Sequence, residues 1–155
     1  MREADLLGAW ILKSFRFEEV ATGRQWEPFG PRPAGTILLN PGGRFFALIT
    51  PTERPSPVTE AEQAAAFRDL IAYSGAYRIE PPDRLVTRVD ISWFPDWIGT
   101  EQLRFCTLRG DDLELVSAAL GMPRAGGESV AVFARVAWCR EMAPSPGAGA
   151  LSGRR

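Results

Sequence analysis

Short and long connections alternate between eight segments in which apolar and polar residues also alternate, and this pattern limits the folds open to the chain. Alternation with period two is typical of strands that bury one face. The connections Pro41–Gly43, Pro81–Asp83 and Gly110–Asp112 are tight turns, whereas the others are long. In an up-and-down antiparallel meander, alternate connections lie at the same end, so we expect one sealed end and one end that carries every long loop. The expected strands are Gly8–Val20, Gly35–Asn40, Arg44–Thr50, Tyr73–Glu80, Arg84–Trp93, Glu101–Arg109, Leu113–Ser117 and Ser129–Arg140.

An eight-stranded meander can close into a barrel whose interior holds side chains or one small ligand. A helix is expected from Thr59 to Ala72, between the third and fourth strands, because Thr59 and Glu62 match the capping-box pattern. The 155 residues fit one domain, which we place at residues 1–142, followed by a disordered Pro/Gly/Ser/Ala-rich tail at 143–155. We therefore predict an all-β, eight-stranded antiparallel barrel with one inserted helix and a mouth at the long-loop end.

The composition excludes several classes of function. A net charge of −1 gives no reason to expect a nucleic acid or a membrane surface as partner, and the absence of His removes the usual general base and the commonest metal ligand. Cys106 and Cys139 fit no CxxC pattern, and we expect two buried free thiols. No apolar run approaches the roughly 20 residues that span a bilayer, and the N-terminus lacks a basic signal-peptide region. We expect a cytoplasmic protein without metal or cofactor, and a homodimer is left open.

Four segments spread over residues 5–140 carry a family resemblance: LLGAWILKSF, AFRDLIAYSGAY, FPDWIGTEQLRF and VAWCR. Together they resemble the lipocalin-like domain family of stand-alone bacterial and fungal barrels, and the Gly8-Ala9-Trp10 motif matches the glycine-x-tryptophan pattern of the first lipocalin strand. The resemblance implies a barrel and a cavity but no settled reaction. It also implies that an Arg near the end of the last strand, Arg140 or else Arg135, packs over Trp10. Gly8, Trp10 and Arg140 would then close the barrel bottom.

Members of this family often carry a His near the position that Arg88 occupies here. This chain has no His, so no His-dependent chemistry carries over.

Aromatic residues mark the expected mouth. Trp93 and Trp97 flank Pro95, and they would either offer apolar surface and an indole N–H to a ligand or plug the gap between loops. Tyr73 and Tyr77 share one face of a strand and should point inward, where their hydroxyls need partners. Those partners are a ligand in one interpretation, and backbone or water in the other.

The sequence does not decide which face of the strands at 84–93 and 101–109 points into the barrel. Gln102 and Arg104 share one face of 101–109, and Phe105 lies on the other. In one interpretation the polar residues are inside, where Arg104 with Asp90 would bind a ligand carboxylate or enolate. In the other they face solvent in a cross-strand charge lattice with Arg88. Both faces thus supply candidate ligand-binding residues: Gln102 and Arg104, or Phe105.

Three functions are compatible with these residues. The first is binding of a small, largely hydrophobic molecule by a cytoplasmic carrier or sensor. The second is a cofactor-free cyclase or isomerase for a polyketide-like or terpenoid-like intermediate, in which Tyr or Arg polarises a carbonyl. The third is a structural barrel with an interior filled by side chains such as Phe15, Phe46, Phe105 and Phe133.

Overall fold

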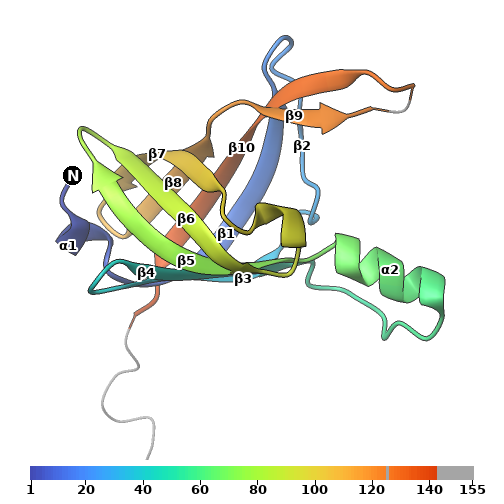
Figure 1. Cartoon of the computed structure of the whole chain (residues 1–155), viewed down its shortest axis with the longest axis horizontal. Coiled ribbons are helices and arrows are strands. Elements are labelled where there is room, and N and C mark those ends of the chain that lie inside the picture. Colours follow the sequence, from blue (N-terminus) through green and yellow to red (C-terminus); the bar gives the residue numbers. More distant parts are fainter. Residues whose placement is uncertain (125, 143–155) are drawn as a thin grey trace, which may run out of the picture.

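The computed structural model describes residues 1–124 and 126–142 and shows a closed antiparallel barrel (Figure 1). Eight strands follow one another around it in chain order, and β1 pairs with β10 to close it. The predicted eight-stranded barrel is therefore confirmed, whereas the predicted tail at 143–155 lies outside the described residues. The barrel strands are β1 (Gly8–Glu19), β3 (Ala34–Asn40), β4 (Arg44–Thr50), β5 (Ile71–Glu80), β6 (Arg84–Ser92), β7 (Glu101–Arg109), β8 (Asp112–Ser117) and β10 (Ser129–Arg140).

The two ends of the barrel differ. At one end lie the tight turns β3–β4, β5–β6 and β7–β8 together with the short helix α1 (Glu3–Leu6) (Figure 1). At the other end lie helix α2 (Glu60–Arg68) and the 3-10 helix η1 (Pro95–Trp97). Two short strands, β2 (Gln25–Trp26) and β9 (Leu120–Pro123), pair with the parts of β1 and β10 that protrude beyond this end. One sealed end and one loop-bearing mouth are thus present.

Helix α2 is shorter than predicted. The sequence pattern predicted a helix as far as Ala72, but the helix ends at Arg68 and Asp69 caps it. Ile71 already pairs with Ile49 of the neighbouring strand β4. A β-branched residue next to an open strand edge gains more from the ladder than from another helical turn, so tertiary pairing overrides the local helix propensity.

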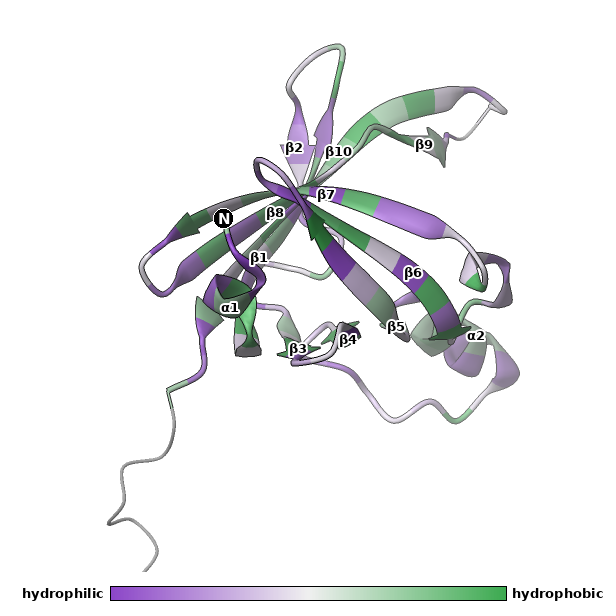
Figure 2. Ribbon diagram, turned by 60° about the vertical axis from the view of Figure 1, so that its left-hand side comes forward, coloured by the Kyte–Doolittle hydropathy of each residue, from purple (hydrophilic) through white to green (hydrophobic). Residues whose placement is uncertain are grey.

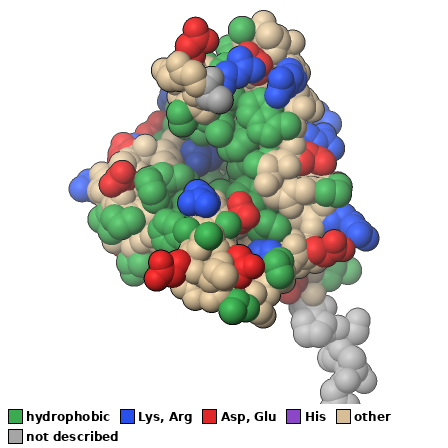
Figure 3. All heavy atoms as spheres, turned by 90° about the vertical axis from the view of Figure 1, so that its right-hand side faces the viewer, with side chains coloured by type: hydrophobic (Ala, Val, Ile, Leu, Met, Phe, Trp, Pro, Cys, Tyr) green, Lys and Arg blue, Asp and Glu red, His purple; other side chains and the backbone are tan. Residues whose placement is uncertain are grey.

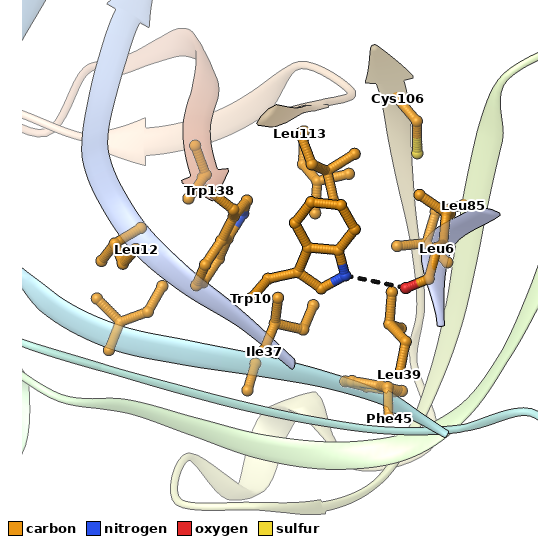
Figure 4. Packing of buried hydrophobic residues seen from close by; sticks show 14 of the residues in the cluster. Leu6, Trp10, Leu12, Ile37, Leu39, Phe45, Leu85, Cys106, Leu113 and Trp138 are labelled. Carbon is orange, nitrogen blue, oxygen red and sulfur yellow. Dashed lines mark hydrogen bonds between the residues drawn. The ribbon is translucent and has the colours of Figure 1, made fainter. Parts of the chain in front are cut away.

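The barrel wall alternates between hydrophobic and hydrophilic residues along its strands (Figure 2). At the sealed end the inward residues pack into a solid core around Trp10, which is fully buried (Figure 4). The Trp10 indole Nε1 donates a hydrogen bond of 2.9 Å to the carbonyl of Leu6, so α1 is tied to the core (Figure 4). The core therefore fills the sealed half of the barrel.

Candidate ligand-binding cavity

The mouth half of the barrel encloses a cavity of about 130 Å³. Strands all around the barrel line it, together with η1 and β9, and its lining is mainly apolar. Figure 3 views the molecule from this end and shows hydrophobic side chains around a hollow, with a basic side chain visible inside. Its aromatic lining residues are Phe15, Phe17, Tyr73, Trp97 and Trp138.

Trp97 lies at the mouth because the loop that carries it folds back on β6. Gly99 N–H donates to the Val89 carbonyl at 2.8 Å, and the Thr100 hydroxyl donates to the Trp97 carbonyl at 2.6 Å. The Trp97 ring packs edge-to-face against Tyr73, with centroids 5.1 Å apart, and against Trp93 at 4.9 Å. A large ring within a turn is thus explained by contacts on both sides of the ring.

Trp93 lies outside the cavity. Its indole Nε1 donates to the Phe67 carbonyl at 3.2 Å, and the side chain lines an outer groove that also includes Phe94 and Met122. Trp97 lines both spaces. It therefore forms the partition between the outer groove and the barrel interior.

Trp138 bounds the cavity on the side of the core. It is 3% exposed and lies beside Trp10 (Figure 4). Its indole Nε1 has no partner among the described residues and no accessible surface, so this N–H faces packed atoms rather than the open cavity.

Arg104 is the charged side chain in the described lining. It comes from β7, where Gln102, Arg104 and the buried Cys106 face inward and Phe105 is 44% exposed. Arg104 Nη1 donates to the Leu103 carbonyl at 3.1 Å, and Nη2 donates to Gln102 Oε1 at 2.9 Å. Gln102 does not line the cavity and instead holds the guanidinium in place.

The structure separates Arg104 from Asp90, which the sequence had placed together as a possible pair. Asp90 lies on the outer face of β6, where it accepts a hydrogen bond of 2.9 Å from Arg44 Nη2. The predicted pairing is therefore wrong. From β6, Leu85 and Thr87 line the cavity; Leu85 pairs with Arg104, and the buried Thr87 has its hydroxyl 3.4 Å from the Gln102 carbonyl.

The two tyrosines of β5 lie in different surroundings. Tyr73 lines the cavity, and its hydroxyl has no hydrogen-bond partner in the described part of the chain yet is not sealed from solvent. Tyr77 lies in the sealed half, where its single hydroxyl proton faces two acceptors, the Asn40 carbonyl at 2.9 Å and Glu3 Oε1 at 3.2 Å. Burial raises the pKa of Tyr77 to about 12, with a further contribution from the neighbouring Glu3 carboxylate. Its hydroxyl is a structural tie between β5, β3 and α1.

The cysteines are both free, but only Cys106 is buried. Burial raises the pKa of the Cys106 thiol to about 12, so it stays protonated at neutral pH and is a poor nucleophile. Cys139 is half-buried, because alternation along β10 turns it to the opposite face from Trp138. The expectation of two buried thiols holds for Cys106 alone.

At the sealed end, the Arg140 guanidinium carbon lies 4.2 Å from the centroid of the Trp10 ring. Its Nη1 and Nη2 donate to the carbonyls of Leu7 and Asp5, each at 2.9 Å. Gly8 has a φ of +119°, and a Cβ there would lie 3.6 Å from Arg140 Nη1, so this position favours glycine. These contacts join both ends of the described chain at the barrel bottom.

Several residues that line the cavity are not among those predicted to bind a ligand. Trp138 was cited only for its family resemblance, although Val132, Ala134, Val136 and Trp138 all fall on one face of β10 and the alternation could have identified them. Leu120 gave no signal, since its strand β9 has only 4 residues and pairs with the protruding part of β10. Of the phenylalanines proposed to fill the interior, Phe46 and Phe105 are exposed.

Helix α2 does not cover the cavity. None of its side chains is buried, and it extends away from the barrel (Figure 1). Phe67 is 46% exposed and lines the outer groove, whereas Ile71, at the start of β5, lines the cavity.

No helix within the described ranges is long and apolar enough to cross a membrane. Over the same residues, no group of three or more His, Cys, Asp or Glu side chains is placed to hold a metal ion.

Comparisons with known proteins agree with this geometry. The model of a lipocalin-like domain matches residues 7–141. A curated relative, the 4'-hydroxy-3'-methoxypropiophenone carrier protein of Aspergillus oryzae, is 39% identical over 66 residues. That match covers 37% of this chain and 58% of the relative, which is less than two thirds of its length.

Proposed function

This chain belongs to the lipocalin-like domain family, and from that premise we propose that it binds a small, largely hydrophobic molecule inside its barrel as a carrier or sensor. The observation that carries the proposal is the apolar cavity of about 130 Å³ between Trp97 and Trp138. Ligand pockets are typically concave and mostly apolar, with a few placed polar groups. Tyr73, Thr87 and Arg104 are those groups here.

The named relative supports the same general kind of function. Its name describes a carrier of a small aromatic ketone, and the shared segment is 39% identical. We extend only the class of cargo to this chain, an aromatic molecule of modest size. The cytoplasmic location and a homodimer stay predictions.

One observation favours the enzymatic alternative, a cofactor-free cyclase or isomerase. Arg104 faces the cavity, and a guanidinium there would stabilise an enolate oxygen. Such a reaction also needs a group that accepts a proton. The described lining holds no Asp or Glu and the chain has no His, so we rank the carrier first.

A filled structural barrel is the third possibility. It is disfavoured because Phe46 and Phe105 are exposed instead of filling the interior.

A cavity-filling variant tests the proposal. Ala134 lines the cavity from β10 and is 6% exposed, so Ala134→Leu should occupy much of the free space and abolish ligand binding without loss of folding. Ala137, on the opposite face of the same strand, gives the matched control Ala137→Leu. Binding is measured by Trp fluorescence on titration with single-ring aromatic ketones, including the relative's named ligand. Equal binding by wild type and Ala134→Leu would exclude the barrel interior as the site.

A further inference from the structure

We propose that the cavity accepts a single aromatic ring that carries an anionic oxygen, a carboxylate or a phenolate, and that Arg104 binds this oxygen. The inference rests on the proposed function, because it names the ligand class of the same cavity. It is carried by the size of the cavity, the charge of its lining and the hydrogen-bonding groups left free.

The size of the cavity sets the size of the ligand. A dry engineered cavity of about 150 Å³ binds benzene, and the cavity here measures about 130 Å³. Aromatic rings line it on several sides, including Phe15, Tyr73 and Trp97, which suits edge-to-face packing of one more ring. A space of this size suits one ring, and a longer substituent would have to pass Trp97 into the outer groove.

The charge of the lining sets the sign of the ligand. Arg104 forms no ion pair with any described carboxylate, whereas Arg44 and Arg135 on the outer face pair with Asp90 and Glu18. Arg104 is half-buried against apolar walls, so its guanidinium has lost part of its water without gaining a counter-ion. A bound anion would supply the missing partner through charge-assisted hydrogen bonds, which are the stronger kind.

The free donors set the chemistry of the ligand oxygen. A guanidinium has five N–H donors, and Arg104 uses one on the Leu103 carbonyl and one on Gln102 Oε1, so the rest remain available. The Tyr73 hydroxyl, also on the lining, has no partner in the described part of the chain. A site rich in donors suits an oxygen that only accepts, as a carboxylate or phenolate does.

Two matched probes test the assignment: benzoate and its neutral counterpart benzamide, titrated by calorimetry. Wild type should bind the carboxylate at least tenfold more tightly. Arg104→Met should reduce that ratio to about one. Arg88→Met, which removes an equal charge from the outer face of neighbouring β6, should leave the ratio unchanged. Arg104→Gln replaces Arg104→Met if circular dichroism shows that the apolar variant does not fold.

A spectroscopic measurement separates the effect of the Arg104 charge from the effect of a change in cavity shape. The phenolate of 4-nitrophenol absorbs visible light, so its pKa can be followed in the complex. Wild type and Arg88→Met should lower that pKa on binding, and Arg104→Met should not, because Arg104 supplies the positive charge and the N–H donors that favour the ionised form.

The outcomes distinguish this inference from the proposed function. Equal binding of benzoate and benzamide by wild type, or a preference for benzoate that survives in Arg104→Met and Arg104→Gln, would overturn the role of Arg104. If Ala134→Leu still abolished ring binding in that case, the cavity itself would stand as the binding site. Failure of every ring probe to bind wild type would overturn both.

Discussion

Tyr73 and Tyr77 lie four residues apart on one face of β5, and their hydroxyls have different roles. Tyr73 contacts Trp97 and the cavity, whereas Tyr77 ties α1 and β3 to the core. The alternation of the strand predicts that both point inward, but it does not say how far along the barrel the core ends. That boundary depends on Trp10, Leu6 and Trp138, which come from segments far apart in the sequence. The alternation of one strand therefore shows which residues point inward, but it does not show which of them line the cavity.

The buried hydroxyl of Tyr77 predicts a loss of stability in alkali. Its pKa is about 12 in the folded chain and about 10 when exposed, so between these values the unfolded state loses a proton that the folded state keeps. Unfolding is then favoured as the pH rises, by at most about 2–3 kcal/mol. Tyr77→Phe should cost about 1 kcal/mol at pH 8, through the lost hydrogen bond, and the gap to wild type should narrow by pH 11. Urea unfolding of both proteins at the two pH values measures this, and a gap that stays constant would contradict it.

At the scale of elements, periodicity predicted the barrel strands because each buries one face. It left the orientation of β7 open, and in the structure Gln102 and Arg104 face inward while Phe105 faces out. Alternation could not choose between the two faces, because a strand that lines a cavity can place a polar group inside. The end of α2 was misjudged because strand pairing of Ile71 overrides local helix propensity. The strands β2 and β9 are too short to leave a period in the sequence.

Helix α2 is stabilised by its cap rather than by packing. The Thr59 hydroxyl accepts from Glu62 N–H at 3.2 Å, Glu62 Oε2 accepts from Thr59 N–H at 2.9 Å, and no helix side chain is buried. Thr59→Ala should therefore weaken the helix by about 1 kcal/mol and speed amide hydrogen exchange within residues 60–68. The midpoint of global unfolding should not change, because the barrel does not depend on α2. A clear fall in that midpoint would show that α2 packs on the barrel in solution.

On the scale of the whole molecule, the barrel divides into a solid half and a hollow half. The sealed end holds α1, the tight turns and the contacts of Arg140 with Trp10. The mouth end holds the cavity, with Trp97 as its partition from the outer groove. Packing at one end stabilises the fold, which leaves the other end free to carry a ligand. The alternation of short and long connections predicts this division. The residues that line the cavity could be identified only from the closed barrel, because they come from strands far apart in the sequence.

If the ligand lies inside the barrel, a crystal structure of the complex will locate it there. We would crystallise the protein with 4-bromobenzoate and measure the anomalous signal of bromine. We predict one strong peak between Trp97 and Trp138, with the carboxylate toward Arg104. A peak confined to the outer groove beside Trp93 and Met122, or no peak at saturating ligand, would show that the barrel interior is not the binding site.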